Sequence, residues 1–366
     1  MRSLKLAELY LMRRTFRSIL ILGAASFALI NSIDFLEALR QVSNQPDAGV
    51  ASAAQLTLLR APQLLMILSP FIMLFGTLMA FAQMARSLEV AVLRAAGFSV
   101  WRIVGAPLAL ALVLGTFLAV AVDPLTTRMS LRADNLLTDI RGTGSVTDKA
   151  FRNGVWLRQK QPNSIYLIHA DIVDLEAEEL RGVFIWRKGP EGEFIERFDA
   201  ERATFQDNAL TLVDPSRSAP GGDAPTNVDD VVIPTTFELA DLALSGTRPE
   251  SLNLWNLPPL MKRIGGAGIP LEPFELRLHE LYAMPLKLAA MAIIACVFAL
   301  PIHARSGGAA RLIIHGIVAG FITFIAIQFS SAVAEAGLVP VMVAAWTPPA
   351  LALLIGVTVL LFREDG

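Results

Sequence analysis

The chain has 366 residues, of which 54% are hydrophobic and only 17% charged, and its mean hydropathy is +0.53. These values exclude an ordinary soluble protein and indicate a membrane protein. The net charge of −2 gives no basic field for nucleic acid, and the single cysteine, Cys296, excludes an intrachain disulfide and a cysteine-based metal site.

Six nearly charge-free stretches are each close to the roughly 20 residues that a helix needs to cross the hydrocarbon core. Flanking charges set their limits. The first three are expected from Ser18 to Ile33, continuing as helix through Leu39, then between Arg60 and Arg86, and between Arg102 and Asp123. The last three follow a long polar region and are expected from about Tyr282 to Ile302, between Arg311 and Glu335, and between Glu335 and Arg363. Within them, Gly105 and Gly115 are expected to be close-packing positions.

Basic residues in short loops predict the orientation, because translocation disfavours them. They fall in three groups: Arg2, Lys5, Arg13, Arg14 and Arg17; Arg86, Arg94 and Arg102; Arg305 and Arg311. We therefore expect both termini in the cytoplasm and the region from about Pro124 to Glu275 outside, in a bacterial periplasm. A cleaved signal peptide ending near Ala24 and Ala25 is the alternative, disfavoured because the helix continues past that point and cleavage would spoil the paired topology.

The outside region is typical of β-structure. Its short segments are rich in β-branched and aromatic residues: 154–159, 164–173, 182–187 and 193–198. Turn signals at 188–192 and at Asp207-Asn208 separate them, which predicts a sandwich or jelly-roll. The stretch from Ser216 to Asn227 is expected to be a loop. Leucines between Pro249 and Ile264 predict a short amphipathic helix returning to the membrane, broken or offset by Pro258-Pro259.

The chain contains none of the motifs of a nucleotide-hydrolysing enzyme or of a metalloprotease. There is no Gly-x-x-x-x-Gly-Lys-[Ser/Thr] loop, no Gly-x-Gly-x-x-Gly after a strand and no His-Glu-x-x-His, and the four histidines have no ligand spacing. We expect no catalytic residue, no metal and no cofactor.

The loop between the second and third predicted spans carries the most informative segment, Met84 to Ser99. It predicts a short surface helix ended by Gly97 in a left-handed cap. Glu89 and Leu93 are expected on one side, with Arg86 and Arg94 flanking them. Such a helix can dock in a cleft of a soluble partner; the alternative is an ordinary solvated turn with interfacial arginines.

A second group lies at the outer end of the first span. Asp34, Glu37 and Arg40 recur at i, i+3 and i+6, which places Asp34 and Glu37 near one face. Ionisable groups near the membrane core mark a polar cavity or a partner contact. The alternative is that these charges are solvated among the lipid headgroups, which suits Arg40 better than Asp34.

Several motifs, in this order, resemble the LptF/LptG (YjgP/YjgQ) family of lipopolysaccharide export permeases, and LptG most. They are Leu88-Glu89-Val90 through Leu93-Arg94-Ala95-Ala96-Gly97-Phe98-Ser99; Pro285-Leu286-Lys287 with Met291-Ala292; Arg305-Ser306-Gly307-Gly308 with Gly316 and Gly320-Phe321; Gly337-Leu338-Val339-Pro340; Ala344-Ala345-Trp346-Thr347-Pro348; and Arg363-Glu364-Asp365. The resemblance covers essentially the whole chain. It implies six transmembrane helices in the inner membrane with an inserted periplasmic all-β jelly-roll. The expected parts are residues 1–123, 124–275 and 276–366.

The resemblance further implies an LptF-like sister subunit and two copies of an LptB-like ATPase, contacted by a coupling helix at about 86–97 that includes Arg86, Glu89, Leu93, Arg94 and Gly97. The first and fifth helices would form lateral gates for lipopolysaccharide, with Asp34, Glu37, Arg40 and Gln328 as candidate cavity or gate residues. Some members carry a basic residue where Asp34 stands; here the charge is reversed, and Arg40 is the nearest basic substitute.

The jelly-roll would pass the lipid to LptC and an LptA-like periplasmic bridge. Its inward side chains must be apolar to hold acyl chains, and the candidates are Val155, Leu157, Tyr166, Ile168, Val183 and Ile185. The alternative for these six is that they form only the domain's own core. Two other functions stay open: a permease for lipoprotein release or force transmission, which usually has four spans, and a membrane scaffold that transports nothing.

Overall fold

The computed structural model describes residues 2–43, 49–141, 155–161, 164–174, 178–190, 193–206, 209–220, 225–235, 249–265, 271–300 and 309–364. It divides into a helical unit, Met1–Ala133 with Glu275–Gly366, and a β unit, Asp134–Phe274. The predictions made for Gly154, for the turns at Glu191-Gly192 and Asp207-Asn208, and for the basic loop at Arg305 lie outside the described residues.

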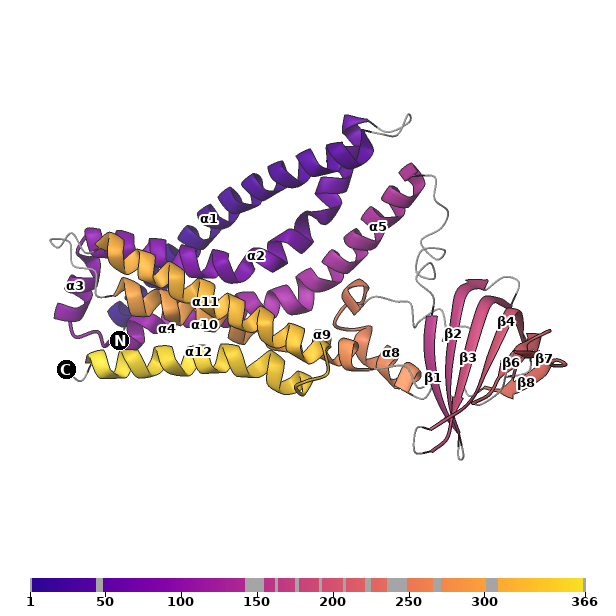
Figure 1. The fold of residues 1–366 in the computed structure, drawn as a ribbon. Helices are drawn as coiled ribbons and strands as arrows, with labels where there is room; N and C mark the ends of the chain where they lie inside the picture. The colour runs from indigo at the N-terminus through magenta and orange to yellow at the C-terminus, as the bar shows by residue number, and fades with distance from the viewer. Residues whose placement is uncertain are drawn as a thin grey trace. The chain divides into compact units, whose positions relative to one another are not determined.

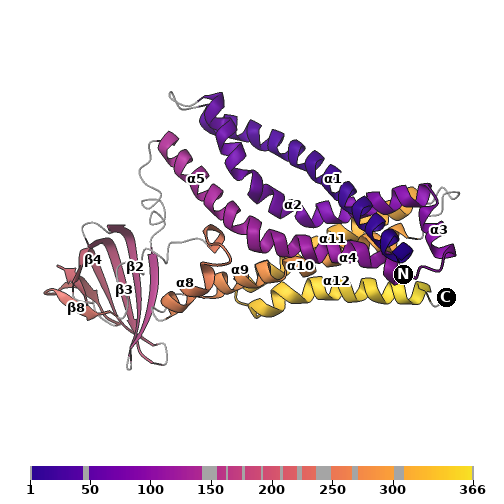
Figure 2. The same ribbon diagram turned by 180° about the vertical axis from the view of Figure 1, so that it is seen from behind.

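Long apolar helices build the helical unit (Figures 1 and 2). They are α1 (Arg2–Val42), α2 (Val50–Arg86), α4 (Val100–Phe117) with the π-helix η1 (Leu118–Val122) and α5 (Asp123–Arg141), α9 (Glu272–Tyr282), α10 (Met284–Ala299), α11 (Ala309–Glu335) and α12 (Val341–Glu364). Among the described residues, five spans are long and apolar enough to cross a membrane, or six if α9 and α10, bent by 49°, form one. The predicted membrane class and the inserted antiparallel β-domain are confirmed.

The helices differ from the predicted spans at two breaks. The third helix does not end at Asp123: after a π-turn it continues through α5 to Arg141, and Pro124, which has no N–H to donate, follows that turn directly. The fourth span is not one straight helix, because Pro285 in the first turn of α10 restarts the helix after Ala283. Gly115 packs against this restart: a Cβ there would lie 2.8 Å from the Pro285 nitrogen, whereas Gly105 has nothing within 4 Å. Of these two glycines only Gly115 is a close-packing position, and the helical glycines Gly76, Gly320 and Gly356 are also closely packed.

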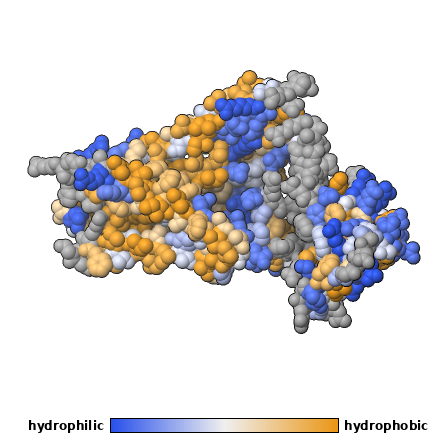
Figure 3. Space-filling view, in the orientation of Figure 1, coloured by the Kyte–Doolittle hydropathy of each residue, from blue (hydrophilic) through white to orange (hydrophobic). Residues whose placement is uncertain are grey.

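Helix α10 forms the centre of the helical unit. It is buried on nearly all sides and packs against α2, α4, α11 and α12. The outer helices instead expose large apolar side chains, among them Leu29, Phe329, Leu354 and Ile355. Figure 3 shows a broad hydrophobic band over the face that carries α11 and α12. This arrangement, apolar both inside and outside, is what a hydrocarbon solvent requires.

The β unit contains one antiparallel sheet. Its strands are β1 (Val155–Gln161), β2 (Ser164–Asp174), β3 (Glu179–Lys188), β4 (Phe194–Gln206), β5 (Ala209–Val213), β6 (Ser216–Ser218), β7 (Thr226–Asn227) and β8 (Val231–Pro234). The main path is β1-β2-β3-β4-β5-β8, and β6 pairs with β4 and β7. The prediction of a loop from Ser216 to Asn227 was wrong at both ends, which are β6 and β7. Arg217 on β6 binds Glu196 on β4 at 2.6 Å, and this ion pair joins the two strands.

The strand register brings the six predicted acyl-path residues into adjacent rows. One row across β1, β2 and β3 consists of Val155, Ala170 and Val183, and the next consists of Leu157, Ile168 and Ile185. In the row after that, Tyr166 of β2 pairs with Arg187 of β3. Ile168, Val183 and Ile185 are almost completely buried, and Tyr166 is half-buried. These rows therefore form one continuous face of the sheet.

The buried face is continued across a corner of the sheet. Gly182 has a positive φ of 62°, and a Cβ there would collide with the Asp171 carboxylate. Past this corner the buried positions shift by one residue, to Leu180 on β3 and Ala203 on β4. Gln159 and Gln161 of β1 both donate to the Pro234 carbonyl of β8, at 2.7 and 3.0 Å, so the sheet curls until its two edge strands meet there.

The predicted return helix begins later than Pro249. A 3-10 turn, η2 (Pro249–Ser251), precedes α8 (Leu257–Ile264), and the two prolines occupy the first turn of α8, where no N–H is needed. The Asn253 side chain accepts hydrogen bonds from the Trp255 and Asn256 amides at 3.1 and 2.9 Å. Leu257, Leu260 and Ile264 form the buried face of this short helix.

We predict that Ile185→Ala lowers the free energy of unfolding of the β unit by about 2–4 kcal/mol, because it leaves a cavity in a fully buried row. Native-state hydrogen exchange of β2–β4 in the detergent-solubilised full chain measures this. Ile172, whose side chain is 53% exposed, is the matched control: Ile172→Ala should change the value by less than about 0.5 kcal/mol. Equal effects of the two substitutions would contradict the assigned face.

Candidate functional site

The loop between α2 and α4 folds into α3 (Glu89–Ala95), held at both ends by left-handed residues. Leu88 has φ 59° and Gly97 has φ 85°. The Phe98 amide donates to the Leu93 carbonyl and the Gly97 amide to the Arg94 carbonyl, both at 3.0 Å, which is a Schellman closure. The predicted left-handed cap at Gly97 is confirmed, while the left-handed Leu88 at the other end was not foreseen.

One side of α3 is an exposed apolar stripe, which we define as Leu88, Ala91, Val92 and Ala95. Ala91, Val92 and Ala95 share one face of α3 by helical spacing, and the left-handed Leu88 precedes them at the N-cap. Leu88 is 55% and Val92 65% exposed. Arg86 and Arg94 are also exposed, as the sequence predicted, and Leu93 instead packs against the core of the helical unit. The arrangement suits docking of a helix into an apolar groove.

The Glu89 carboxylate is engaged inside the chain. Its Oε1 accepts from the Ser87 hydroxyl at 2.6 Å and lies 3.0 Å from Arg14, and its Oε2 accepts from the Tyr10 hydroxyl at 2.8 Å. Partial burial raises its pKa, but the hydrogen bonds from Ser87 and Tyr10 and the Arg14 charge outweigh burial, so the pKa is lowered. The contribution of these contacts to stability is thus present at neutral pH and is lost only as pH falls through the lowered pKa. The Glu89 side chain is 26% exposed beside these contacts, and its predicted contact with a partner stays a prediction.

The three charged residues predicted at the outer end of α1, Asp34, Glu37 and Arg40, do not share one environment. Asp34 faces α2 and lies 3.8 Å from Arg60, with both side chains mostly buried. Glu37 and Arg40 lie 3.8 Å apart on the exposed side. Arg60, taken from the sequence only as a span limit, also donates to Gln41 at 3.2 Å. The position of Arg60 among the apolar residues Leu58, Leu59 and Ala61 was the sequence signal that this arginine needs an acidic partner nearby.

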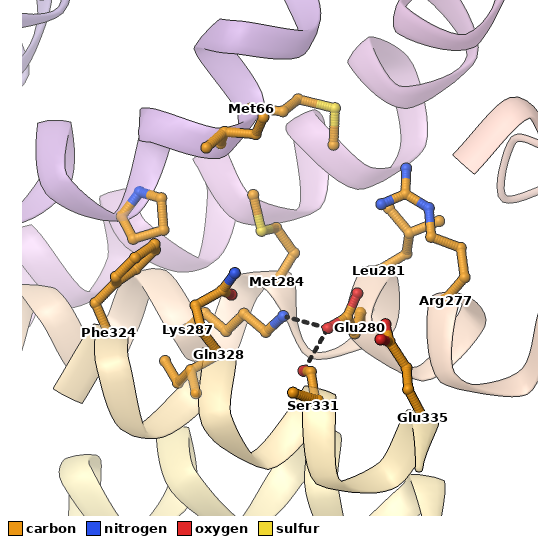
Figure 4. A pocket seen from close by; sticks show the side chains of 14 residues that line it. Met66, Arg277, Glu280, Leu281, Met284, Lys287, Phe324, Gln328, Ser331 and Glu335 are labelled. Atoms are coloured by element: carbon orange, nitrogen blue, oxygen red, sulfur yellow. Dashed lines mark hydrogen bonds and ion pairs between the residues drawn. The ribbon is translucent and has the colours of Figure 1, made fainter. Parts of the chain in front are cut away.

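A cavity of about 390 Å³ lies between α2, α9, α10 and α11 (Figure 4). The predicted gate residue Gln328 lines it, beside apolar groups such as Met66 and Phe324. Asp34, Glu37 and Arg40 do not line it. The cavity is also lined by five polar residues that the sequence did not indicate as site residues: Arg277, Glu280, Lys287, Ser331 and Glu335.

The polar wall is organised around Glu280. The Ser331 hydroxyl donates to its Oε1 at 2.6 Å and the Lys287 ammonium lies 3.9 Å from the same oxygen, so both side chains point at Glu280 (Figure 4). Only 11% of the Lys287 side chain is exposed. A lysine in an otherwise apolar helix was the sequence signal for this site. Contacts of Glu280 thus join α9 to α10 and to α11.

A stronger ion pair lies at the π-turn. Arg277 of α9 donates to Asp123 at 2.7 Å, and the Asp123 side chain is completely buried. The two residues are far apart in sequence, and Asp123 was predicted only as the end of a span. The pair fastens the start of α5 to the helix that precedes the bend.

The comparisons with known proteins agree with this architecture. The model of the family described as Lipopolysaccharide export system permease LptF/LptG matches residues 9–362, which is nearly the whole chain. No individual curated protein matches the chain. In the part of the chain that the structure describes, no group of His, Cys, Asp and Glu side chains is arranged to hold a metal ion.

We predict that Asp123→Asn destabilises the helical unit by about 3 kcal/mol, because it leaves the Arg277 charge buried without its counter-charge. Thermal unfolding in detergent measures the loss. The exposed pair is the control: Glu37→Gln should cost less than about 1 kcal/mol. Replacing both partners, as Asp123→Asn with Arg277→Leu, should recover part of the loss; no recovery would contradict a pairwise role.

Proposed function

Since the chain belongs to the LptF/LptG family of lipopolysaccharide export permeases, we propose that it extracts lipopolysaccharide from the inner membrane as a transmembrane subunit driven by a separate ATPase. The family's permeases are transmembrane subunits without an ATPase domain. The observation that carries the proposal is the exposed apolar stripe on α3, in a chain with no nucleotide-binding motif of its own.

We place α3 in the cytoplasm. The start of α1, α3 and the end of α12 lie at the same end of the helical unit in both views (Figures 1 and 2). Arg13, Arg14, Arg86, Arg94 and Arg102 belong to the segments at this end. Basic flanks favour the cytoplasmic side. Both termini are then cytoplasmic and the β unit is periplasmic, which supports parts 1–123, 124–275 and 276–366 as functional divisions.

The stripe and its flanking arginines fit a groove on an LptB-like ATPase. Leu88 and Val92 would supply the buried apolar contact, while Arg86 and Arg94 would meet acidic groups at the rim. A dimeric ATPase has two such grooves, so a sister permease of the LptF type would fill the other. The chain itself would take the LptG place, on the motifs given above.

Lipid would reach the cavity past α1 and α11, the two proposed gates. Gln328 of α11 lies on the cavity wall, and α1 exposes apolar side chains over much of its length. The cavity's cations are already paired, Lys287 with Glu280 and Arg277 with Asp123, so an anionic headgroup would have to compete for them. Arg40, mostly exposed at the outer end of α1, is the freer basic group for headgroup phosphates.

The β unit would receive the acyl chains. The rows through Ile168, Ile185 and Val183 give a continuous apolar face, and Tyr166 and Arg187 mark its polar end. From there the lipid would pass to LptC and to an LptA-like bridge. Five to six spans disfavour the alternative of a four-span permease for lipoproteins.

We predict that Val92→Asp abolishes co-purification of the ATPase, because it places a charge in the middle of the apolar stripe. Pull-down of the detergent-solubilised complex measures the bound ATPase. Ser99→Asp adds the same charge outside the stripe, and aspartate can replace Ser99 as the N-cap that accepts from the Arg102 amide; it should keep full binding. Normal ATPase recovery with Val92→Asp would exclude α3 as the docking element.

A further inference from the structure

The segment between the β-sheet and α9 contains an amphipathic helix that begins one turn before α8. The Leu257 amide donates to the Asn253 carbonyl at 3.1 Å, which is the i to i−4 bond of an α-helix. The residues from Asn253 onward therefore continue the helical spacing of α8. One side of this helix is buried, and it consists of Asn253, Leu254, Leu257, Leu260 and Ile264.

The opposite side carries an exposed tryptophan and two cations. Trp255, Lys262 and Arg263 follow the i, i+7, i+8 spacing of one helix face, and Pro259 lies between them. Trp255 is 60% exposed, and the other three residues are exposed as well. We define these four residues as the Trp255 face.

The Trp255 face has an unbalanced positive charge. In the part of the chain that the structure describes, neither Lys262 nor Arg263 forms an ion pair. The one acidic residue of the segment 249–265 is Glu250, which belongs to η2 and precedes the helix. Basic side chains without counter-charges attract an anionic membrane surface, and tryptophan is enriched at the level of the lipid headgroups.

The chain keeps the Trp255 face within reach of the membrane. Eight residue steps separate Ile264 from Glu272, where α9 begins, so the end of α8 lies at most about 29 Å from that point. Helices α9 and α10 together form the bent candidate span. The first turn of α9 carries Glu272 and Glu275, which a span places among the headgroups and not in the hydrocarbon.

We propose that the Trp255 face is an interaction surface for the anionic phospholipid headgroups of the periplasmic leaflet. Lys262 and Arg263 bind headgroup phosphates, and the Trp255 indole lies at the boundary between headgroups and acyl chains. The buried side of the same helix belongs to the β unit, so the contact ties this unit to the membrane surface near the point where the chain re-enters it. The proposal uses the periplasmic placement given above but does not depend on lipid export.

A spin label on the Trp255 face tests the contact. Cys296 is completely buried, so a nitroxide reacts with the introduced thiol of Pro259→Cys. The full chain is reconstituted, without lipopolysaccharide, in vesicles of phosphatidylcholine or of an equal mixture with phosphatidylglycerol. Collisions with oxygen report lipid, and collisions with a nickel complex present on both sides of the vesicle report water. We expect the oxygen-to-nickel ratio to be at least about threefold higher in the mixture.

Substitutions on the same labelled chain separate the two parts of the face. Lys262→Glu with Arg263→Glu should lower the ratio in the mixture to the value found in phosphatidylcholine. Arg202→Glu makes the same charge change at an exposed position of β4 and should leave the ratio unaltered. Trp255→Ser should lower the ratio in both kinds of vesicle, whereas Trp255→Tyr should keep it, because tyrosine also favours the interface.

Three results would overturn the proposal. Equal access of nickel in both kinds of vesicle would place the face in water. Few collisions with either reagent would show that protein covers it. Protection from nickel that appears only when lipopolysaccharide is added would show that the face binds that lipid in place of phospholipid. None of these results bears on ATPase docking, which Val92→Asp tests separately.

Discussion

Charge inside an apolar bundle is the constraint on which this structure depends. An ionised group away from water is tolerated only with a counter-charge or hydrogen bonds close by. The helical unit meets this at three places: Asp34 with Arg60, Asp123 with Arg277, and Glu280 with Lys287 and Ser331. Two of them lie at irregularities of the helices, at the π-turn before α5 and at the bend between α9 and α10. Two of the three charge groups thus lie where helices of the bundle break.

The same logic relates the two ends of α1. At the outer end a mostly buried ion pair attaches it to α2, and at the inner end a polar network attaches it to α3. Between them lies an uninterrupted helix whose surface is largely apolar.

Much of the fold could be predicted from the sequence because its signals are local. Apolar length predicted the spans and Gly97 the cap of α3. The flanking charges did not give all the helix limits, since α2 begins at Val50 and the third helix continues past Asp123. Segments rich in β-branched and aromatic residues between turn signals predicted the first strands, and Ile168, Val183 and Ile185 were expected to point inward. The gate residue Gln328 does line the cavity, while the transport roles of all these residues stay predictions.

What could not be predicted depends on long-range pairing. Asp123 and Pro124 have the composition of a helix end, but the helix continues there, and Arg277, brought close by the fold, pairs with the buried Asp123. Strand β6 lies within a Pro- and Ser-rich stretch, where it pairs with β4 and β7 and Arg217 reaches Glu196. The inward engagement of Glu89 needs Tyr10 and Arg14 from another helix, so the spacing around Glu89 alone favoured an outward projection.

If the proposed function is correct, ATP hydrolysis by a partner empties the cavity between α2, α10 and α11 of lipopolysaccharide. A photo-cross-linking amino acid at Gln328, in the reconstituted complex, tests this most directly. We expect a lipopolysaccharide adduct before ATP is added and a clear loss of that adduct after hydrolysis begins. An adduct that ATP leaves unchanged, or no adduct in either state, would contradict it.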